Sequence, residues 1–305
     1  MIIITAPVHL SLLDALQKKG YEYLYAPDIS YTVLSEKIHV AKGLIVSTRI
    51  PIDQPMLEKA IHLKWIGRLG SGMELIDVAF AEKNNILCFS SPEGNRNAVA
   101  EHALGMLLSF MHNIQKSAAE VKKAIWLRNE NRGVELAGKT IGIIGYGNTG
   151  ASFAKLLTSF DVNILAHDKY KSGFGNQQIQ EVGLDFICKN ADVISLHLPL
   201  SAETIHYANA DFFNSVEKIP IIINTARGKI IDTTALLSAL QNEKISGALL
   251  DVLENEAIEK FTEDEKAAFE FLVNQKNVLI TPHIAGYSTE SYYKMGQILL
   301  EKIGI

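Results

Sequence analysis

The stretch that decides the fold is Ile141-Gly142-Ile143-Ile144-Gly145-Tyr146-Gly147-Asn148-Thr149-Gly150. An apolar strand runs into a GxGxxG turn and then into a helix that is predicted to begin near Asn148. Gly145 permits the tight turn, Gly147 lets the backbone approach a pyrophosphate, and Gly150 lets the helix pack against the strand. The unpaired N–H groups at the helix start favour an anion. Taken alone, the pattern also fits an ordinary glycine-rich turn.

The next apolar strand ends in an acid. Residues 163–168 run to Asp168, which lies 18 residues after Gly150. In dinucleotide-binding folds, an acid at this point accepts hydrogen bonds from the adenine ribose and repels the 2′-phosphate of NADP. We therefore expect a dinucleotide site that takes NAD. Lys169 and Lys171 keep NADP open as an alternative, because nearby cations tolerate a phosphate; otherwise they belong to a solvated loop.

Apolar runs alternate with helical patterns along the whole chain, which indicates parallel sheets covered by helices on both faces. The predicted fold class is α/β, with two Rossmann-like doubly wound parallel-sheet domains. A long helix is predicted over 97–119, and a charged, proline-free stretch over 259–274 is expected to be a further helix. After the polar stretch at 128–132, strands are predicted at 140–145, 163–168, 191–198, 221–225, 247–252 and 278–281.

Composition excludes several classes of protein. The 305 residues are 48% hydrophobic and 21% charged, with a net charge of −5, which is typical of a globular protein and unfavourable for binding nucleic acid or an anionic membrane. Cys88 and Cys188 cannot form a disulfide framework or a structural zinc site, and we expect no metal. The N-terminus resembles a first strand and no targeting segment, so a cytoplasmic location is expected. The length suggests about two domains, yet no linker is visible.

Three chemically useful residues follow three later apolar strands. Arg227 follows residues 221–225, Glu256 follows 247–252, and His283 follows 278–281. An arginine matches a carboxylate bidentately, and a histidine exchanges protons near neutral pH. Ligands of open α/β sheets bind beyond the carboxyl ends of the strands, so these side chains can converge there. Each of them alone could equally be a surface or turn residue.

Together these motifs resemble the D-isomer-specific 2-hydroxyacid dehydrogenases. The resemblance covers about residues 70–286, most of the chain. The segments that carry it stand in a specific order: Pro92-Glu93-Gly94-Asn95, Val99-Ala100-Glu101-His102, the glycine turn, His197-Leu198-Pro199-Leu200 with Thr204, Asn224-Thr225-Ala226-Arg227-Gly228, Asp251-Val252 with Glu256, and Thr281-Pro282-His283-Ile284-Ala285-Gly286.

The resemblance implies a catalytic role for each of the three strand-end residues. Arg227 would hold the substrate carboxylate and polarise its carbonyl, and His283 would give a proton to the carbonyl oxygen or take it back. Glu256 would hydrogen-bond His283 and keep the imidazolium available. Glu254 is the alternative orienting residue, but Glu256 lies five residues after Asp251, as the family pattern requires. His102 is expected to be packed in its helix.

The resemblance also implies a set of NAD-binding residues. Asp251 matches a position on the nicotinamide side of the cofactor, whereas His197 could contact the cofactor or be structural. The whole set is Gly145, Tyr146, Gly147, Asn148, Thr149, Gly150, Asp168, His197, Pro199, Thr204, Thr225, Ala226, Asp251 and Gly286.

The substrate is expected to be recognised partly by the N-terminal region. The turn Gly70-Ser71-Gly72 would offer backbone N–H groups to the carboxylate that Arg227 holds. Ser71 and Gly72 are the residues of this turn that are expected to contact the substrate. Arg49 could meet a substrate phosphate, since phosphate-using members of the family often carry an arginine near this point, or it could be a surface arginine. Arg227 and His283 complete the expected substrate contacts.

The chain looks most like short bacterial phosphoglycerate dehydrogenases, so 3-phosphoglycerate oxidation in serine biosynthesis is the leading expectation. A glyoxylate, hydroxypyruvate or other 2-keto acid reductase is the alternative, and an NAD(H)-sensing regulatory protein is the alternative from another class. The family's substrate domain is discontinuous, here 1–97 with 286–305 around an NAD-binding domain at 98–285, which accounts for the missing linker. A homodimer through the NAD-binding domain is expected.

One local departure from the family pattern concerns the residues after Glu256. Family members usually have proline next, followed by a short proline-rich loop, whereas Ala257 follows here. His283 comes 27 residues after Glu256, a longer interval than the family pattern predicts. The geometry of this loop is therefore expected to differ from the family pattern.

Overall fold

The structure is a computed structural model that describes all residues from Met1 to Ile305. It divides into two compact units, one made of Met1–Arg96 with Tyr287–Ile305 and the other of Asn97–Gly286. These bounds lie within one residue of those predicted. The chain passes from the first unit to the second inside helix α5 (Pro92–Met111), and it returns to the first unit shortly before helix α12 (Thr289–Lys302). A crossing inside a helix is the reason that no linker composition is visible in the sequence.

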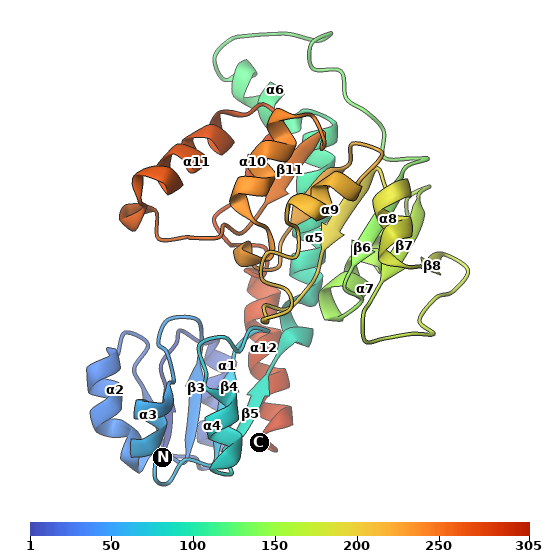
Figure 1. The fold of residues 1–305 in the computed structure, drawn as a ribbon. Helices are drawn as coiled ribbons and strands as arrows, with labels where there is room; N and C mark the ends of the chain where they lie inside the picture. Colours follow the sequence, from blue (N-terminus) through green and yellow to red (C-terminus); the bar gives the residue numbers. More distant parts are fainter. The chain divides into compact units, whose positions relative to one another are not determined.

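The first unit is built on a five-stranded parallel sheet with the order β2-β1-β3-β4-β5, of which Figure 1 labels β3, β4 and β5. This order is one of the two common doubly wound arrangements. Each strand is a short apolar or mixed run whose successive side chains point to opposite faces. The strands are β1 (Ile2–Ile4), β2 (Tyr23–Tyr25), β3 (Gly43–Val46), β4 (Trp65–Arg68) and β5 (Leu87–Ser90).

Helices cover both faces of this sheet. Ile2 and Ile4 face α1 (Leu10–Lys18) and α12, whereas Ile3 faces the cluster formed with the remaining helices. Leu299 of α12 packs so closely on β4 that a Cβ at Gly67 would lie 2.7 Å from it. The C-terminal helix therefore belongs to the core of this unit. The opposite face is covered by α2 (Tyr31–Lys37), η1 (Ile38–Val40), α3 (Gln54–Lys59) and α4 (Val78–Lys83).

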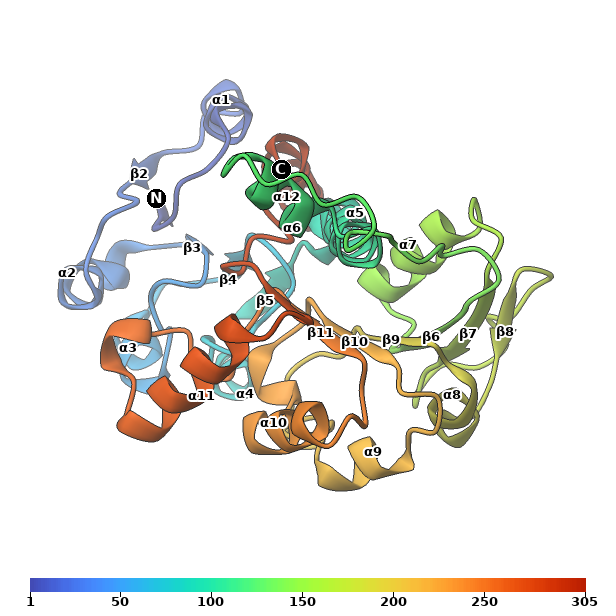
Figure 2. The same ribbon diagram turned by 90° about the horizontal axis from the view of Figure 1, so that it is seen from above.

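The second unit contains a seven-stranded parallel sheet with the order β12-β11-β10-β9-β6-β7-β8 (Figure 2). Counted from its own first strand, this is the Rossmann order with a seventh strand added. The prediction of α/β architecture with two parallel sheets is confirmed. The strands are β6 (Thr140–Ile144), β7 (Asn163–His167), β8 (Ile179–Glu181), β9 (Val193–Leu196), β10 (Ile221–Asn224), β11 (Gly247–Leu250) and β12 (Val278–Ile280).

Helices cover both faces of this sheet as well, and each face has its own hydrophobic core. Helices α5 and α7 (Asn148–Leu157) cover one face, and α8 (Leu184–Asn190), α9 (Ala210–Ser215) and α10 (Thr233–Gln241) cover the other, as Figure 2 shows. This arrangement brings the carboxyl ends of all seven strands, and the loops that follow them, to one edge.

The long helix differs from its prediction. It begins at Pro92 instead of Asn97 and ends at Met111, after which α6 (Ile114–Val121) starts anew. Proline is tolerated in a first helical turn because the N–H groups there have no intrahelical partner. Asn113, with φ of 51°, takes a left-handed conformation that interrupts the helix.

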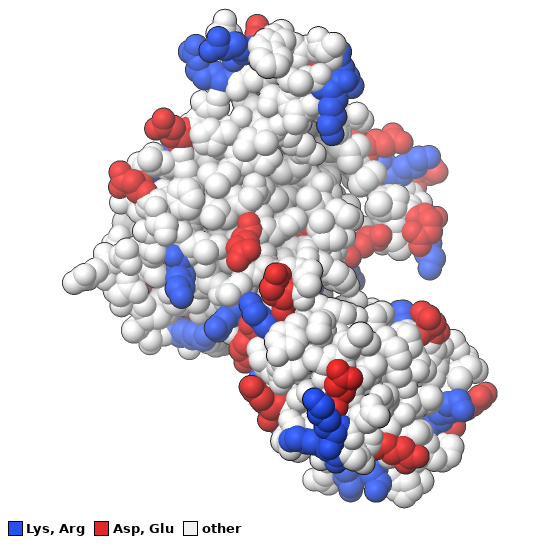
Figure 3. Space-filling view, turned by 180° about the vertical axis from the view of Figure 1, so that it is seen from behind, with Lys and Arg blue, Asp and Glu red and all other residues white.

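The stretch after Glu256 is helical, as expected. It forms η3 (Ile258–Lys260) and α11 (Glu263–Asn274). Helix α11 begins with a capping box between Thr262 and Glu265. None of the helices in the structure has both the length and the apolar character needed to cross a membrane. On the face drawn in Figure 3, basic and acidic side chains are interspersed, without an extended basic patch.

Candidate active site

The glycine turn after β6 has the tight geometry that its sequence predicts. Gly145 has φ of 95°, and a Cβ there would lie 2.5 Å from the carbonyl oxygen of His197. A Cβ at Gly150 would lie 2.0 Å from the carbonyl oxygen of Gly145. Neither position accepts a side chain without a backbone shift. The turn and the first turn of α7 are therefore held close to β6.

Gly147 differs from the other two glycines because its surroundings are open. No atom lies within 4 Å of the place where its Cβ would be, and the residue is the N-cap of the 10-residue helix α7. The hydroxyl Oγ1 of Thr225, at the end of β10, is buried and has no hydrogen-bond partner. An open cradle at a helix N-terminus and an unpartnered hydroxyl fit a bound dinucleotide.

Asp168 organises the loop after β7 with its carboxylate. Oδ2 accepts from the N–H of Tyr146 at 2.8 Å, and Oδ1 accepts from the N–H groups of Tyr170 at 2.9 Å and Lys171 at 3.0 Å. A carboxylate has further lone pairs, so hydrogen bonds from ribose hydroxyls remain possible. The acid thus ties the glycine turn to the next loop of the sheet.

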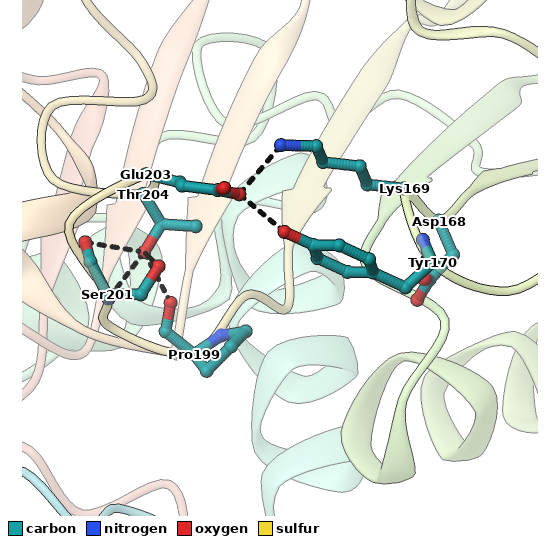
Figure 4. A network of polar contacts seen from close by, with 7 residues as sticks. All are labelled: Asp168, Lys169, Tyr170, Pro199, Ser201, Glu203 and Thr204. Atoms are coloured by element: carbon teal, nitrogen blue, oxygen red, sulfur yellow. Dashed lines mark hydrogen bonds and ion pairs between the residues drawn. The ribbon is translucent and has the colours of Figure 1, made fainter.

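Two of the predicted cofactor-binding side chains have internal partners. The ring of His197 is buried, 2.9 Å from Ser195 Oγ and 3.2 Å from Thr149 Oγ1, and burial lowers its pKa to about 4. The hydroxyl of Thr204 donates to the carbonyl of Pro199 at 2.6 Å within its own turn (Figure 4). Contacts of His197, Pro199 and Thr204 with a cofactor stay predictions.

His283 and Glu256 are brought together across 27 residues of sequence. Nδ1 of His283, after β12, lies 2.9 Å from Oε2 of Glu256, after β11. The side chains are 42% and 45% exposed, so both can be reached from solvent. His283 has φ of 54°, and its N–H is bonded to the carbonyl of Asp251 at 2.7 Å. This uncommon backbone conformation turns the imidazole toward Glu256.

The loop that carries His283 is held by Asp251, which is only 1% exposed. Its Oδ1 accepts from the Thr281 hydroxyl at 2.6 Å and from the N–H of Ile284 at 2.9 Å, and its Oδ2 accepts from the N–H of Ala285 at 2.8 Å. Nε2 of His102, on α5, lies 3.0 Å from the Thr281 hydroxyl. Sequence reasoning missed Thr281 and this task of His102. Asp251 therefore positions the histidine loop, and its expected contact with the nicotinamide stays a prediction.

Arg227 follows β10, next to β11 in the sheet. The side chain of Asn224 bonds both to the N–H of Ala226, at 3.0 Å, and to the carbonyl of Arg227, at 2.9 Å. Arg227 donates from Nη1 to the Ala226 carbonyl at 2.7 Å. A Cβ at Gly228 would lie 1.7 Å from the carbonyl oxygen of Leu253. The arginine loop is thus packed against the segment that leads to Glu256.

Glu254 does not face His283 and is not a solvated charge. Its Oε1 lies 2.6 Å from Nε2 of His206, and its Oε2 accepts from the N–H and hydroxyl of Thr233, at 3.1 and 2.7 Å. Burial raises its pKa, but the hydrogen bonds from Thr233 and His206 outweigh burial and lower it. Glu254 is therefore a structural link between two loops and the start of α10.

The predicted substrate residues of the first unit lie in loops at the ends of its strands. Arg49, after β3, is exposed and donates from Nη2 to the carbonyl of Thr5 at 3.2 Å. Ser71 is exposed and Gly72 partly so, in the turn that follows β4. Gly70, with φ of 127°, shapes this turn, and its N–H donates to the hydroxyl of Ser91 at 3.0 Å. Their part in substrate binding stays a prediction.

A seven-stranded Rossmann sheet, an open glycine turn and an acid after the second strand define a dinucleotide-binding protein. Comparison with known proteins narrows this class. Residues 104–285 match the NAD-binding domain of the D-isomer specific 2-hydroxyacid dehydrogenase family. The chain belongs to this family, a family of NAD-dependent oxidoreductases that act on CH–OH groups, so the resemblance inferred from the motifs is confirmed.

Individual relatives are similar over most of this chain. D-3-phosphoglycerate dehydrogenase of Methanocaldococcus jannaschii is 34% identical over 308 residues, 99% of this chain and 56% of the relative. Hydroxypyruvate reductase of Thermotoga maritima is 34% identical over 260 residues, 85% of this chain and 83% of the relative. The structure of Aquifex aeolicus D-lactate dehydrogenase, complexed with NAD and lactic acid, has a TM-score of 0.85 at 28% identity, and the match covers 99% and 94% of the two chains. The chain thus spans about half the length of the phosphoglycerate dehydrogenase it matches.

Proposed function

We propose that the chain is an NAD-dependent D-2-hydroxyacid dehydrogenase. The observation that carries the proposal is the pair of His283 Nδ1 and Glu256 Oε2 at 2.9 Å, both side chains exposed at the edge of the sheet that carries the glycine turn. This histidine is accessible to a substrate and is oriented by a carboxylate, as a general acid–base requires.

The tautomer of His283 follows from its partner. Glu256, an acceptor when ionised, takes the hydrogen bond from Nδ1–H, which leaves Nε2 to face the substrate. In the neutral ring, Nε2 accepts the proton of the C2 hydroxyl as the alcohol is oxidised. In the imidazolium, Nε2 donates a proton to the carbonyl oxygen in the reverse direction. In both directions the step passes through the imidazolium, whose positive charge Glu256 stabilises.

Arg227 is proposed to bind the substrate carboxylate, since a guanidinium is a planar donor that matches a carboxylate. Asn224 and Gly228 set the conformation of its loop, as described above. When NAD is bound, the nicotinamide accepts or supplies the hydride. The pyrophosphate would lie at Gly147 and the adenine ribose at Asp168. The protein therefore contributes placement, charge and one proton.

The proposed substrate is 3-phosphoglycerate, whose oxidation feeds serine biosynthesis. The similarity to D-3-phosphoglycerate dehydrogenases supports it, and Arg49 is the candidate partner of the phosphate. The similarity to hydroxypyruvate reductase of Thermotoga maritima favours hydroxypyruvate or glyoxylate reduction as a second candidate. A cytoplasmic location and a role as an NAD(H)-sensing regulator stay untested expectations.

NADH oxidation with 3-phosphohydroxypyruvate, hydroxypyruvate, glyoxylate and pyruvate tests these proposals. We expect the highest kcat/KM with 3-phosphohydroxypyruvate, and Arg49→Ala should raise KM for this substrate alone. Equal effects of Arg49→Ala on all four substrates would remove Arg49 from phosphate recognition. Tight NADH binding without turnover of any of the four would favour the sensor.

We further propose a homodimer. Helix α6 and the chain that follows it expose apolar side chains far more than a core would, with Ile114 54%, Trp126 76% and Val134 55% exposed. Exposed apolar side chains gathered along one segment are typical of an interaction site. Since the patch belongs to the NAD-binding unit, a second copy of this chain is the proposed partner.

A further inference from the structure

A polar network joins the loops that follow β7 and β9. Lys169 Nζ lies 2.7 Å from Oε2 of Glu203, and the hydroxyl of Tyr170 donates to the same oxygen (Figure 4). Strands β7 and β9 are the two neighbours of β6 in the sheet. Lys169 and Glu203 therefore come from the loops on either side of the strand that carries the glycine turn. Their side chains meet where the adenosine half of a dinucleotide is expected.

The network begins directly after Asp168, the proposed ribose ligand. The 2′-phosphate of NADP would add nearly two negative charges at this point. Two lysines of the loop could compensate for them. Lys171 Nζ is directed to the carbonyl of Tyr146, at 3.2 Å, and Lys169 is directed to Glu203. The lysine that a phosphate could recruit is thus already paired with a second carboxylate.

We propose that Glu203 is a specificity-determining residue that favours NAD(H) over NADP(H) by holding Lys169. The inference rests on the proposed function, because it assumes that a dinucleotide binds with its ribose at Asp168. Glu203 acts in two ways: it engages the ammonium group that would bind the 2′-phosphate, and it adds a negative charge beside Asp168. Without Glu203, Lys169 would be available to bind the 2′-phosphate and so offset the repulsion between that phosphate and Asp168.

The pair can be altered without unfolding the protein. Lys169 and Glu203 are 64% and 56% exposed, and such surface pairs contribute little to stability. The hydrogen bond with Glu203 raises the pKa of Lys169, and those from Lys169 and Tyr170 lower the pKa of Glu203, so both groups are charged near neutral pH. Removing one such charge in water should change the affinity for a nearby phosphate by about tenfold.

Binding of NADH and of NADPH to the whole chain, measured by fluorescence titration without substrate, tests the inference. We compare the wild type with Glu203→Gln, with the double variant Glu203→Gln/Lys169→Ala, and with Glu120→Gln. Glu120, on α6, is paired with Lys116 at 3.6 Å and serves as a matched loss of one negative charge elsewhere in the same unit. Each titration is repeated at low and at high salt, because salt screens the interaction between exposed charges and should therefore reduce an electrostatic effect on the affinity.

Glu203→Gln should tighten NADPH about tenfold at low salt and leave NADH nearly unchanged, since NADH lacks the 2′-phosphate. The double variant should lose this gain, and Glu120→Gln should resemble the wild type. Equal tightening of both dinucleotides, or a gain that survives Lys169→Ala, would overturn the inference while the proposed function stands. Failure of the wild type to bind either dinucleotide would overturn the proposed function and the inference with it.

Discussion

At the scale of single residues, the loops after the strands of the second unit contain two close His–Glu pairs. His283 lies 2.9 Å from Glu256, and His206 lies 2.6 Å from Glu254. Their surroundings give them different tasks. Glu254 also accepts two hydrogen bonds from Thr233 and therefore has a structural role. Glu256 has only His283 as a partner among the hydrogen bonds described.

Replacing His283 tests its role as the proton donor and acceptor. His283→Ala should lower kcat about 10²–10⁴-fold, the usual contribution of a general acid–base, and leave the Kd of NADH nearly unchanged. Steady-state kinetics and a binding titration measure the two quantities. His206→Ala is the matched control and should keep most of kcat. Near-normal turnover of His283→Ala would refute the role.

Buried His197 makes stability depend on pH. Its folded pKa of about 4 lies below the ordinary 6.5, so the folded state prefers the neutral ring. The contribution of the neutral His197 ring to the free energy of unfolding is fully present above pH 6.5. It is lost as the pH falls toward 4, by about 3 kcal/mol in total. Urea denaturation at pH 7.5, 6 and 5 measures the effect. His197→Gln should show a flatter dependence over this range, and an equally steep one would exclude His197 as the cause.

At the scale of elements, the segment after Glu256 replaces a short loop with a helix. The side chain of Asn255 donates from Nδ2 to Oε1 of Glu265 on α11 at 2.8 Å, and its Oδ1 accepts from the N–H of Ala257 at 3.0 Å. The capping box of α11 uses the same glutamate. The residue next to Glu256 is thus anchored by α11, which supplies the rigidity that a proline-rich loop would otherwise supply.

The glycine turn permits a test that separates binding from folding. Gly147→Ala should keep the melting temperature, because its surroundings are open and its φ of −87° suits any residue, but should weaken NADH binding tenfold or more (roughly) by blocking the pyrophosphate. Gly150→Ala should lower the melting temperature, because its Cβ would lie 2.0 Å from a carbonyl oxygen. Calorimetry and titration measure both. Unchanged NADH affinity in Gly147→Ala would argue against the proposed pyrophosphate position.

At the scale of the whole molecule, the chain forms two units, each with its own hydrophobic cores on the two faces of a parallel sheet. The first unit is completed only when the C-terminal helix α12 adds Leu299 and Leu300 to the cluster around Leu12. Removing α12 would expose the part of that face that Leu299 and Leu300 cover, since α1 covers the rest. The discontinuity is therefore a requirement of packing.

The proposed homodimer belongs to this scale. Trp126→Ala combined with Val134→Asp should shift the chain toward the monomer, because both side chains are mostly exposed on the apolar patch near α6. Light scattering after size-exclusion chromatography, over a range of concentrations, measures the mass. Leu10→Asp, at a residue 71% exposed in the first unit, is the matched control and should leave the mass unchanged. A wild-type mass of one chain at all concentrations would disprove the dimer.

The sequence by itself determined the fold class, the glycine turn with its acid, and the family. These features are local: apolar runs predict strands, and a GxGxxG pattern after such a run predicts a tight turn wherever it stands. The short edge strand β8, of which only Ile179 is buried, carried too weak a local signal to be predicted. The break at Asn113 was missed for the same reason.

Only the tertiary structure decided which groups meet. The contact of Glu256 with His283 was expected from the family resemblance alone. The links of Asp251 to a loop 30 to 34 residues away and of Glu203 to Lys169 across 34 residues were not predicted. Such contacts depend on the order of the strands in the sheet and on the conformation of the loops that follow them. Neither is encoded at the positions of the contacting residues, so partners such as Lys169 for Glu203 emerge only when the strands are assembled side by side.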